Sequence, residues 1–103
     1  MAPEIRENIE LIIEACKKMQ VKTLYVFGSS AREDYSQKSD IDFLYSMFTG
    51  ENGLPLGQYD YFDLLFKLEE ITGKKVDLIA EKGIRNKYFL AEVMKDRQKI
   101  YEA

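Results

Sequence analysis

Two aspartates that stand two positions apart, Asp40 and Asp42, are the residues of this chain best suited to chemistry. They alternate with apolar Ile41 and Phe43, and in a strand that spacing puts both carboxylates on one face, roughly 6.5 Å apart along the chain. Two carboxylates so close repel each other unless a cation lies between them. The pair predicts a Mg²⁺ site, although turn chemistry at Asp40 and a solvated Asp42 would give the same pattern.

A glycine–serine turn lies upstream of the aspartates. The apolar residues 24–27 suit a buried strand, Gly28 permits a tight exit from it, and Ser29 and Ser30 open a short helix. The free backbone N–H groups at the start of a helix bind anions. An ordinary turn after a strand can have the same residues, but together the two motifs predict a phosphate cradle beside a metal site.

The composition excludes several other chemistries. The chain has 103 residues, a net charge of −3 and no histidine. Without histidine there is no zinc hydrolase of the histidine-ligand type and no serine or cysteine nucleophile activated by imidazole, which leaves carboxylate and metal chemistry. The acidic balance argues against extended nucleic-acid binding, and no apolar run is long enough to cross a membrane. The first residues lack the features of a signal peptide, so we expect a cytoplasmic protein.

The hydrophobic pattern predicts one α/β (α+β) domain over residues 1–103, with helices packed on a small sheet. We expect helices over residues 4–19, 58–72 and 86–95 and a short one over 29–33. Strands are expected over 21–27, 41–46 and 75–80, and residues 98–101 would form a closing strand or a further helical turn. Residues 49–57, with three glycines and a proline, would form a loop.

Individual positions follow from these elements. Cys16 falls on the apolar side of the first helix and should be a buried thiol. In the helix over 58–72 the expected buried stripe is Phe62, Leu65, Phe66 and Leu68, and Gly73 should end the helix. The aromatic residues around its start (Phe48, Tyr59, Tyr61 and Phe62, with Leu54) would be core and rim, or else a base-stacking platform or a partner-docking patch.

The chemical residues together resemble a known family. Gly28-Ser29, then Asp40-Ile41-Asp42, then the strand Val76-Asp77-Leu78-Ile79 resemble the signature of the DNA polymerase β-type nucleotidyltransferase superfamily. In length and in the sequence of residues 28–42 the chain is most similar to the minimal nucleotidyltransferases, the MNT domains. These domains are commonly encoded beside HEPN-domain proteins. The resemblance covers essentially the whole chain and implies a nucleotidyltransferase fold, a small mixed sheet flanked by helices.

The resemblance also implies roles for single residues. Asp40 and Asp42 match the two metal-binding acids of the family, and Asp77 matches the third acid, which takes a proton or holds the second of two Mg²⁺ ions. The triphosphate of ATP or another nucleoside triphosphate would bind at the turn of Gly28, Ser29 and Ser30, helped by Arg32, although this arginine could equally form an ordinary surface ion pair. Glu33 departs from the small residue that the family commonly has after this arginine, and its carboxylate would repel phosphate unless it turned to solvent.

The function that the resemblance implies is transfer of AMP from ATP to a tyrosine or serine hydroxyl of a HEPN-domain partner, by the antitoxin of a toxin–antitoxin pair. A second hypothesis is a non-catalytic module that binds its partner by contact alone. A chain of about one hundred residues can form only part of the walls of a cleft that binds a base and a ribose. For the same reason a second copy, in a homo-oligomer, is a further expectation. Transfer to a small molecule or to an RNA end is the third hypothesis.

Overall fold

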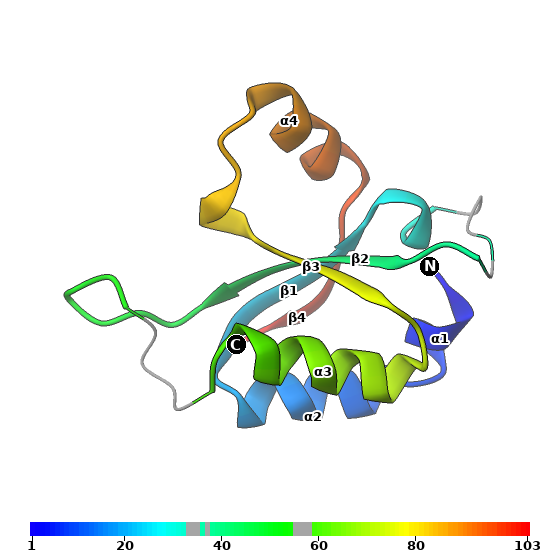
Figure 1. Ribbon diagram of the computed structural model, residues 1–103, viewed down its shortest axis with the longest axis horizontal. Helices are drawn as coiled ribbons and strands as arrows, with labels where there is room; N and C mark the ends of the chain where they lie inside the picture. The colour runs from blue at the N-terminus through cyan, green and yellow to red at the C-terminus, as the bar shows by residue number, and fades with distance from the viewer. Residues whose placement is uncertain (33–35, 37, 55–58) are drawn as a thin grey trace.

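The protein forms a four-stranded sheet with helices on both faces (Figure 1). The structure is a computed structural model that describes residues 1–32, 36, 38–54 and 59–103. Helices α2 and α3 lie side by side on one face, and α4 stands on the other. In chain order the elements are α1 (Pro3–Arg6), α2 (Ile9–Lys18), β1 (Val21–Phe27), the 3₁₀ turn η1 (Gly28–Ser30), β2 (Ile41–Met47), α3 (Tyr61–Thr72), β3 (Val76–Ala80), the 3₁₀ turn η2 (Glu81–Gly83), α4 (Lys87–Asp96) and β4 (Gln98–Glu102).

The sheet is mixed, and its strand order is β3-β2-β1-β4. β1 is antiparallel to both β2 and β4, whereas β2 and β3 are parallel. The connection between these parallel neighbours contains α3, as a crossover between parallel strands usually does. Of the two alternatives for residues 98–101 the closing strand is correct, and the predicted α/β class with a small mixed sheet is confirmed.

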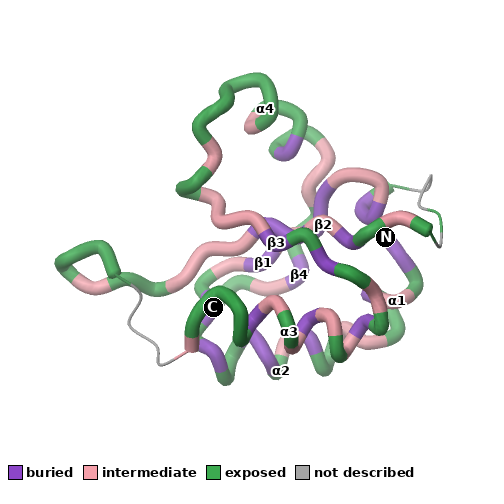
Figure 2. Tube along the Cα trace, in the orientation of Figure 1, coloured by how far each residue is buried: buried purple, intermediate pink, exposed green. Residues whose placement is uncertain are grey.

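The main core lies between the sheet and the helices α2 and α3, where the buried residues concentrate (Figure 2). It contains Leu24 and Phe43 from the sheet and Ile12, Leu64 and Leu68 from the helices, none of them more than 1% exposed. A smaller cluster, made of Phe27, Leu44 and Val93, holds α4 against the opposite face. The two faces are therefore packed very unequally, and the face under α4 is the more open one. Cys16 is fully buried as predicted, and burial raises the pKa of its thiol to about 12.

The single helix predicted over residues 4–19 is wrong in one respect, because the chain breaks between α1 and α2. The side chain of Asn8 donates a hydrogen bond to the carbonyl of Glu4 (2.8 Å), while the backbone N–H of Asn8 bonds to Ile5 instead. An asparagine side chain can replace the helical bond in this way and open the helix. Ile5 and Ile9 stand four residues apart across the break, which is the spacing of a continuous helix, so the pattern could not reveal it.

Helix α3 starts three residues later than predicted, because Asp60 caps it. Asp60 accepts a hydrogen bond from the N–H of Asp63, and the carboxylate of Asp63 accepts one from the N–H of Asp60. This reciprocal pair satisfies two N–H groups that the helix leaves free. At the other end Gly73 adopts a left-handed φ of 68° and ends the helix as predicted.

The predicted buried stripe of α3 is wrong in phase. Leu68 is buried, but Phe62 and Phe66 are 57% and 61% exposed, and the buried positions are Leu64, Leu68 and Thr72. Apolar residues surround this helix, so periodicity alone allows two faces, and the packing against β3 and α2 selects the leucine face. Of the neighbouring aromatic group, expected to be core and rim, Tyr59 packs against the core, whereas Phe48, Tyr61, Phe62 and Leu54 are exposed and lie outside it.

The loop before α3 contains no helix or strand over residues 48–54, apart from a single bridge at Thr49, and its remaining predicted positions 55–57 lie outside the described residues. The helix predicted over 86–95 is present as α4, with Asn86 as its N-cap. Within the described part of the chain no helix is long and apolar enough to span a membrane.

Candidate active site

The predicted glycine–serine turn follows β1 directly. Gly28 has a φ of 67°, a left-handed conformation that side chains other than glycine rarely adopt, and it opens η1. The buried hydroxyl of Ser30 donates to the carbonyl of Asp40 (3.2 Å), and the carbonyl of Ser30 accepts from the N–H of Ala2 (2.8 Å). These bonds fix the turn to the start of β2 and to the first residues of the chain. The helix predicted over 29–33 is shorter than expected, and Glu33 lies outside the described residues.

The three predicted acids come together at the end of the sheet nearest this turn. Asp42 and Asp77 are direct partners in the parallel pair of β2 and β3, so their side chains leave the same face of the sheet. Asp40 precedes Asp42 by two positions, at the entrance to β2. Leu44 and Ile79 come next on the same face, under α4, whereas Val76 and Leu78 point into the main core. Asp77 thus lies on the same side of the sheet as Asp42, exposed to solvent as Asp40 is.

The surroundings of Asp42 disfavour the ionised form of its carboxyl group. The pKa of its carboxyl is raised from 3.8 to about 6, chiefly by burial and in addition by the negative charges of Asp77 and Asp40. The effect of each neighbour confirms that the three carboxylates are close enough to interact. A group of acids that repel one another is the arrangement that a bound cation would stabilise.

Gly28 and Asp42 touch across the strand pair. A Cβ atom placed on Gly28 would lie 2.7 Å from Oδ2 of Asp42, which is shorter than any ordinary contact. The residue before the glycine, Phe27, is the direct partner of Asp42 in the antiparallel pair of β1 and β2. The backbone of the turn therefore approaches the acidic group so closely that only a glycine fits between them.

Arg32 forms a surface ion pair, the alternative to a phosphate contact, and the sequence did not indicate which acid it would pair with. Its guanidinium donates to the carboxylate of Asp96 at the end of α4 (2.6 Å), and both side chains are partly exposed. Beside this pair, the amide of Gln98 donates to the carbonyl of Ala31 (2.9 Å). The phosphate-binding role predicted for Arg32 stays a prediction, and in it the arginine would have to share or leave Asp96. The partner is 64 residues away in the sequence, so no local signal could have found it.

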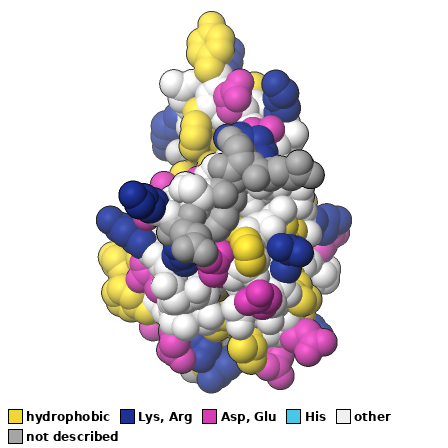
Figure 3. Space-filling model, turned by 90° about the vertical axis from the view of Figure 1, so that its right-hand side faces the viewer, with side chains coloured by type: hydrophobic (Ala, Val, Ile, Leu, Met, Phe, Trp, Pro, Cys, Tyr) yellow, Lys and Arg dark blue, Asp and Glu magenta, His cyan; other side chains and the backbone are white. Residues whose placement is uncertain are grey.

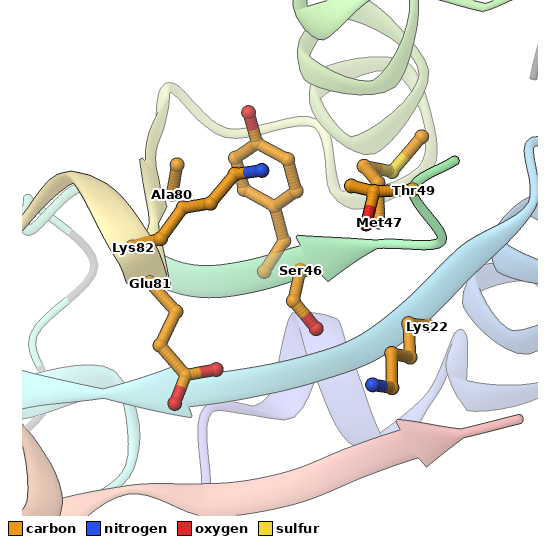
Figure 4. A pocket seen from close by; sticks show the side chains of 8 residues that line it. Lys22, Ser46, Met47, Thr49, Ala80, Glu81 and Lys82 are labelled. Atoms are coloured by element: carbon orange, nitrogen blue, oxygen red, sulfur yellow. The ribbon is translucent and has the colours of Figure 1, made fainter. Parts of the chain in front are cut away.

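A cavity of about 430 Å³ lies at the opposite ends of β2 and β3, and none of the predicted site residues line it. It forms where β2 continues beyond its last pairing with β3, at Tyr45 and Ala80. In Figure 4 the side chains of Glu81, Ser46 and Lys22 point to one side of β2, and those of Lys82, Met47 and Thr49 point to the other. The cavity is thus separated from the acids by the length of the strands.

The surface near the turn carries charges of both signs. On the face shown in Figure 3, lysine and arginine side chains are interspersed with acidic ones around the atoms drawn in grey. A strong field of one sign is absent from the visible described residues of this face, and such a field is what binding along a nucleic-acid backbone relies on.

Comparisons with known proteins agree with this geometry. A candidate protein adenylyltransferase from Methanocaldococcus jannaschii is 39% identical over 79 residues, which cover 77% of this chain and 76% of the relative. A second candidate protein adenylyltransferase from the same organism is 34% identical over 80 residues, 78% of this chain and 76% of the relative.

Solved structures with the same fold include a candidate minimal nucleotidyltransferase, with a TM-score of 0.72, 25% identity and 95% of each chain covered. The MNT antitoxin in complex with a tri-AMPylated HEPN toxin, from Shewanella oneidensis, has a TM-score of 0.61 and 18% identity over 95% of this chain and 72% of the other.

The family model described as polymerase beta, nucleotidyltransferase matches residues 10–103. This range contains the glycine–serine turn and all three aspartates. The resemblance drawn from those residues is confirmed: the chain belongs to the polymerase beta nucleotidyltransferase family.

Proposed function

We propose that this nucleotidyltransferase moves AMP from ATP to a hydroxyl group of a partner protein, in a reaction that depends on Mg²⁺. The observation that carries the proposal is the convergence of Asp40, Asp42 and Asp77 on one side of the sheet, against the turn at Gly28. Such a site offers acids for a cation and backbone N–H groups for phosphate, which are the two requirements of phosphoryl-group chemistry.

The donor set fits magnesium. Carboxylate oxygens are hard ligands, and the raised pKa of Asp42 reflects a negative potential that a divalent cation would neutralise. Among the described residues no group of three or more His, Cys, Asp or Glu side chains is placed to hold a metal ion by itself. Mg²⁺ is commonly bound by one or two carboxylates together with substrate phosphates, and Asp40 and Asp42 would serve in that way, while Asp77 would hold a second ion or take a proton. When bound, it would supply charge neutralisation at the phosphates and a lowered pKa of the acceptor hydroxyl.

The chain's own residues would then perform the positioning. The N–H groups at Ser29 and Ser30 would hold the triphosphate, and the close approach of Gly28 to Asp42 sets the phosphates beside the acids. The exposed carboxylate of Asp77 would accept the proton of the attacking hydroxyl, which attacks the α-phosphorus as pyrophosphate leaves on the opposite side. Arg32 would add positive charge from the far side of the turn.

The names of related proteins support a protein acceptor. The relatives from Methanocaldococcus jannaschii are candidate protein adenylyltransferases, and the chain covers about three quarters of each. Two structural neighbours are a toxin–antitoxin complex with AMP-PNP and the MNT antitoxin with its tri-AMPylated HEPN toxin. We therefore infer that the partner is a HEPN-domain toxin, and that adenylylation of its tyrosine or serine hydroxyl makes this chain an antitoxin.

The test is the intact mass of the partner after incubation. The purified chain is mixed with ATP, Mg²⁺ and the product of the gene adjacent to its own, which we expect to be a HEPN-domain protein, and mass spectrometry counts the AMP groups added. A double variant, Asp40→Asn/Asp42→Asn, should add none. Its matched control is Glu10→Gln/Glu14→Gln, which removes two exposed acids of α2 on the other face of the sheet and should be as active as the unmodified chain.

The same variants separate the other hypotheses. If the double aspartate variant neutralises the toxin in cells as well as the unmodified chain does, contact alone suffices and the catalytic proposal is wrong. If ATP is consumed with Mg²⁺ but the partner gains no mass, the acceptor is another molecule, and labelled ATP should then mark a small molecule or an RNA end.

A further inference from the structure

Helix α4 leaves most of its large apolar side chains exposed to solvent. Of its apolar residues only Val93 is buried, whereas Tyr88, Phe89 and Met94 are 86%, 40% and 38% exposed. Hydrophobic side chains accordingly stand out at the top of Figure 3, the end of the molecule at which α4 lies in Figure 1. Side chains of this kind cost free energy in water unless something covers them.

One of these residues adjoins the candidate active site. The ring of Phe89 meets the ring of Phe27 edge to face, with centroids 6.1 Å apart and planes at 78°. Phe27 immediately precedes Gly28 and is the direct cross-strand partner of Asp42. Phe89 therefore packs against the residue that lies directly beside Asp42 in the sheet.

The end of α4 is held in place beside the turn. Asp96 binds Arg32, and Val93 packs against Phe27 and Leu44 in the smaller core cluster. Phe89 lies one helical turn before Val93, on the same side of the helix. Its ring is thus positioned by buried contacts on one edge while two fifths of the residue stay open to solvent. This is the geometry of a fixed aromatic platform.

We propose that the open surface of Phe89 is the platform on which the base of the bound nucleoside triphosphate stacks. The inference rests on the proposed function, since it requires a triphosphate held at Gly28 and Asp42. A triphosphate fixed there extends its ribose and base away from the acids, and the wall on the α4 side presents an aromatic ring. Because the two rings are nearly perpendicular, Phe27 covers at most one face of the Phe89 ring, and Phe89 stays 40% exposed; a base would stack on the face that remains open.

The chemistry predicts the class of ligand. Every nucleobase has a π-face, so a single ring without hydrogen-bonding groups distinguishes bases only by their stacking area. Purines offer a larger area than pyrimidines, and we therefore expect ATP and GTP to bind more tightly than CTP and UTP. An aliphatic side chain at position 89 should reduce that preference together with the affinity.

The experiment compares the affinity of the chain for a complete nucleotide with its affinity for the triphosphate part alone. Binding of ATP, CTP and inorganic tripolyphosphate, each with Mg²⁺, is measured by calorimetry for the unmodified chain, Phe89→Leu and Phe89→Tyr. The matched control is Phe66→Leu, which removes an exposed phenylalanine on the other face of the sheet, with its own ring partner Phe62 at 6.0 Å. Melting temperatures of all variants show whether each is folded.

We expect Phe89→Leu to bind ATP about five- to tenfold more weakly, to bind tripolyphosphate unchanged and to lose much of the preference for ATP over CTP. Phe89→Tyr and Phe66→Leu should match the unmodified chain. Equal losses for ATP and tripolyphosphate would mean that Phe89 acts only by supporting the turn, and unchanged ATP binding would mean that the base lies elsewhere; either result overturns the platform. If the unmodified chain binds neither ATP nor tripolyphosphate, the proposed function itself is wrong.

Discussion

The substitution Asp42→Asn should stabilise the protein while abolishing nucleotide transfer. The pKa of the Asp42 carboxyl is about 6 in the folded chain, against 3.8 without the influence of the fold. The folded state therefore disfavours the ionised carboxylate, by an upper limit of about 3 kcal/mol for a difference of about two pKa units. Because the side chain is only half-buried, solvent screens much of this, and we expect about 1 to 1.5 kcal/mol at pH 7.5.

The sign of the pH dependence follows from the raised pKa. Between pH 3.8 and about 6 the folded chain binds the Asp42 proton more tightly than the unfolded chain, so the contribution of this group to stability falls as the pH rises through that range. Above about pH 6 the full cost is present, and below pH 3.8 it disappears. An asparagine has no proton to lose, so its advantage should be large at pH 7.5 and vanish near pH 3.5.

The assay is denaturation of both proteins in EDTA at the two pH values. At pH 7.5 the melting temperature of Asp42→Asn should be about 5 to 10 °C higher, as expected for about 1 to 1.5 kcal/mol in a domain of this size. Glu14→Gln, at an exposed position of α2, is the control and should melt like the unmodified chain. An advantage of equal size at both pH values, or none at pH 7.5, would refute the raised pKa of Asp42 that burial and the charges of Asp77 and Asp40 produce.

Three further substitutions test the contacts around the site. Gly28→Ala should destabilise the chain by about 1 to 3 kcal/mol, because it forces a left-handed φ on alanine and a Cβ atom against Asp42. Denaturant titration measures the loss, and a neutral result would contradict the close approach of Gly28 to Asp42. Asp60→Ala should cost about 1 kcal/mol by removing the N-cap of α3, without changing the affinity for ATP, so weaker ATP binding would show that this helix end affects the site. Asp96→Asn should cost less than about 1 kcal/mol, because its pair with Arg32 is partly exposed; a loss of several kcal/mol in the same titration would show that the pair holds α4 in place.

Sequence patterns placed the turn and the first two aspartates well because these positions depend on local features. Alternation around Asp42 defines a strand with one acidic face, and the glycine before Ser29 marks the turn, so the positions of both motifs follow from short windows. The third acid, Asp77, could be matched only by resemblance. Its position opposite Asp42 depends on the parallel pairing of two strands separated by a whole helix, and no local pattern encodes that pairing.

The errors arose where tertiary packing chose among local alternatives. Asn8 interrupts a helix whose isoleucine spacing continues across the break, because a side-chain hydrogen bond competes with the backbone bond. The phase of α3 depends on which face meets the sheet, and that choice exposes Phe62 and Phe66. The ion pair of Arg32 and the ring contact of Phe89 join segments far apart in the chain, so both required coordinates.

The most direct test of the central claim is the mass of a HEPN-domain partner after incubation with ATP and Mg²⁺, measured with the unmodified chain and with Asp77→Asn. If the three acids form one catalytic group, the partner gains AMP with the unmodified chain and gains none with the variant. Full AMP addition by Asp77→Asn, in a protein shown to be folded, would contradict the assignment of that group.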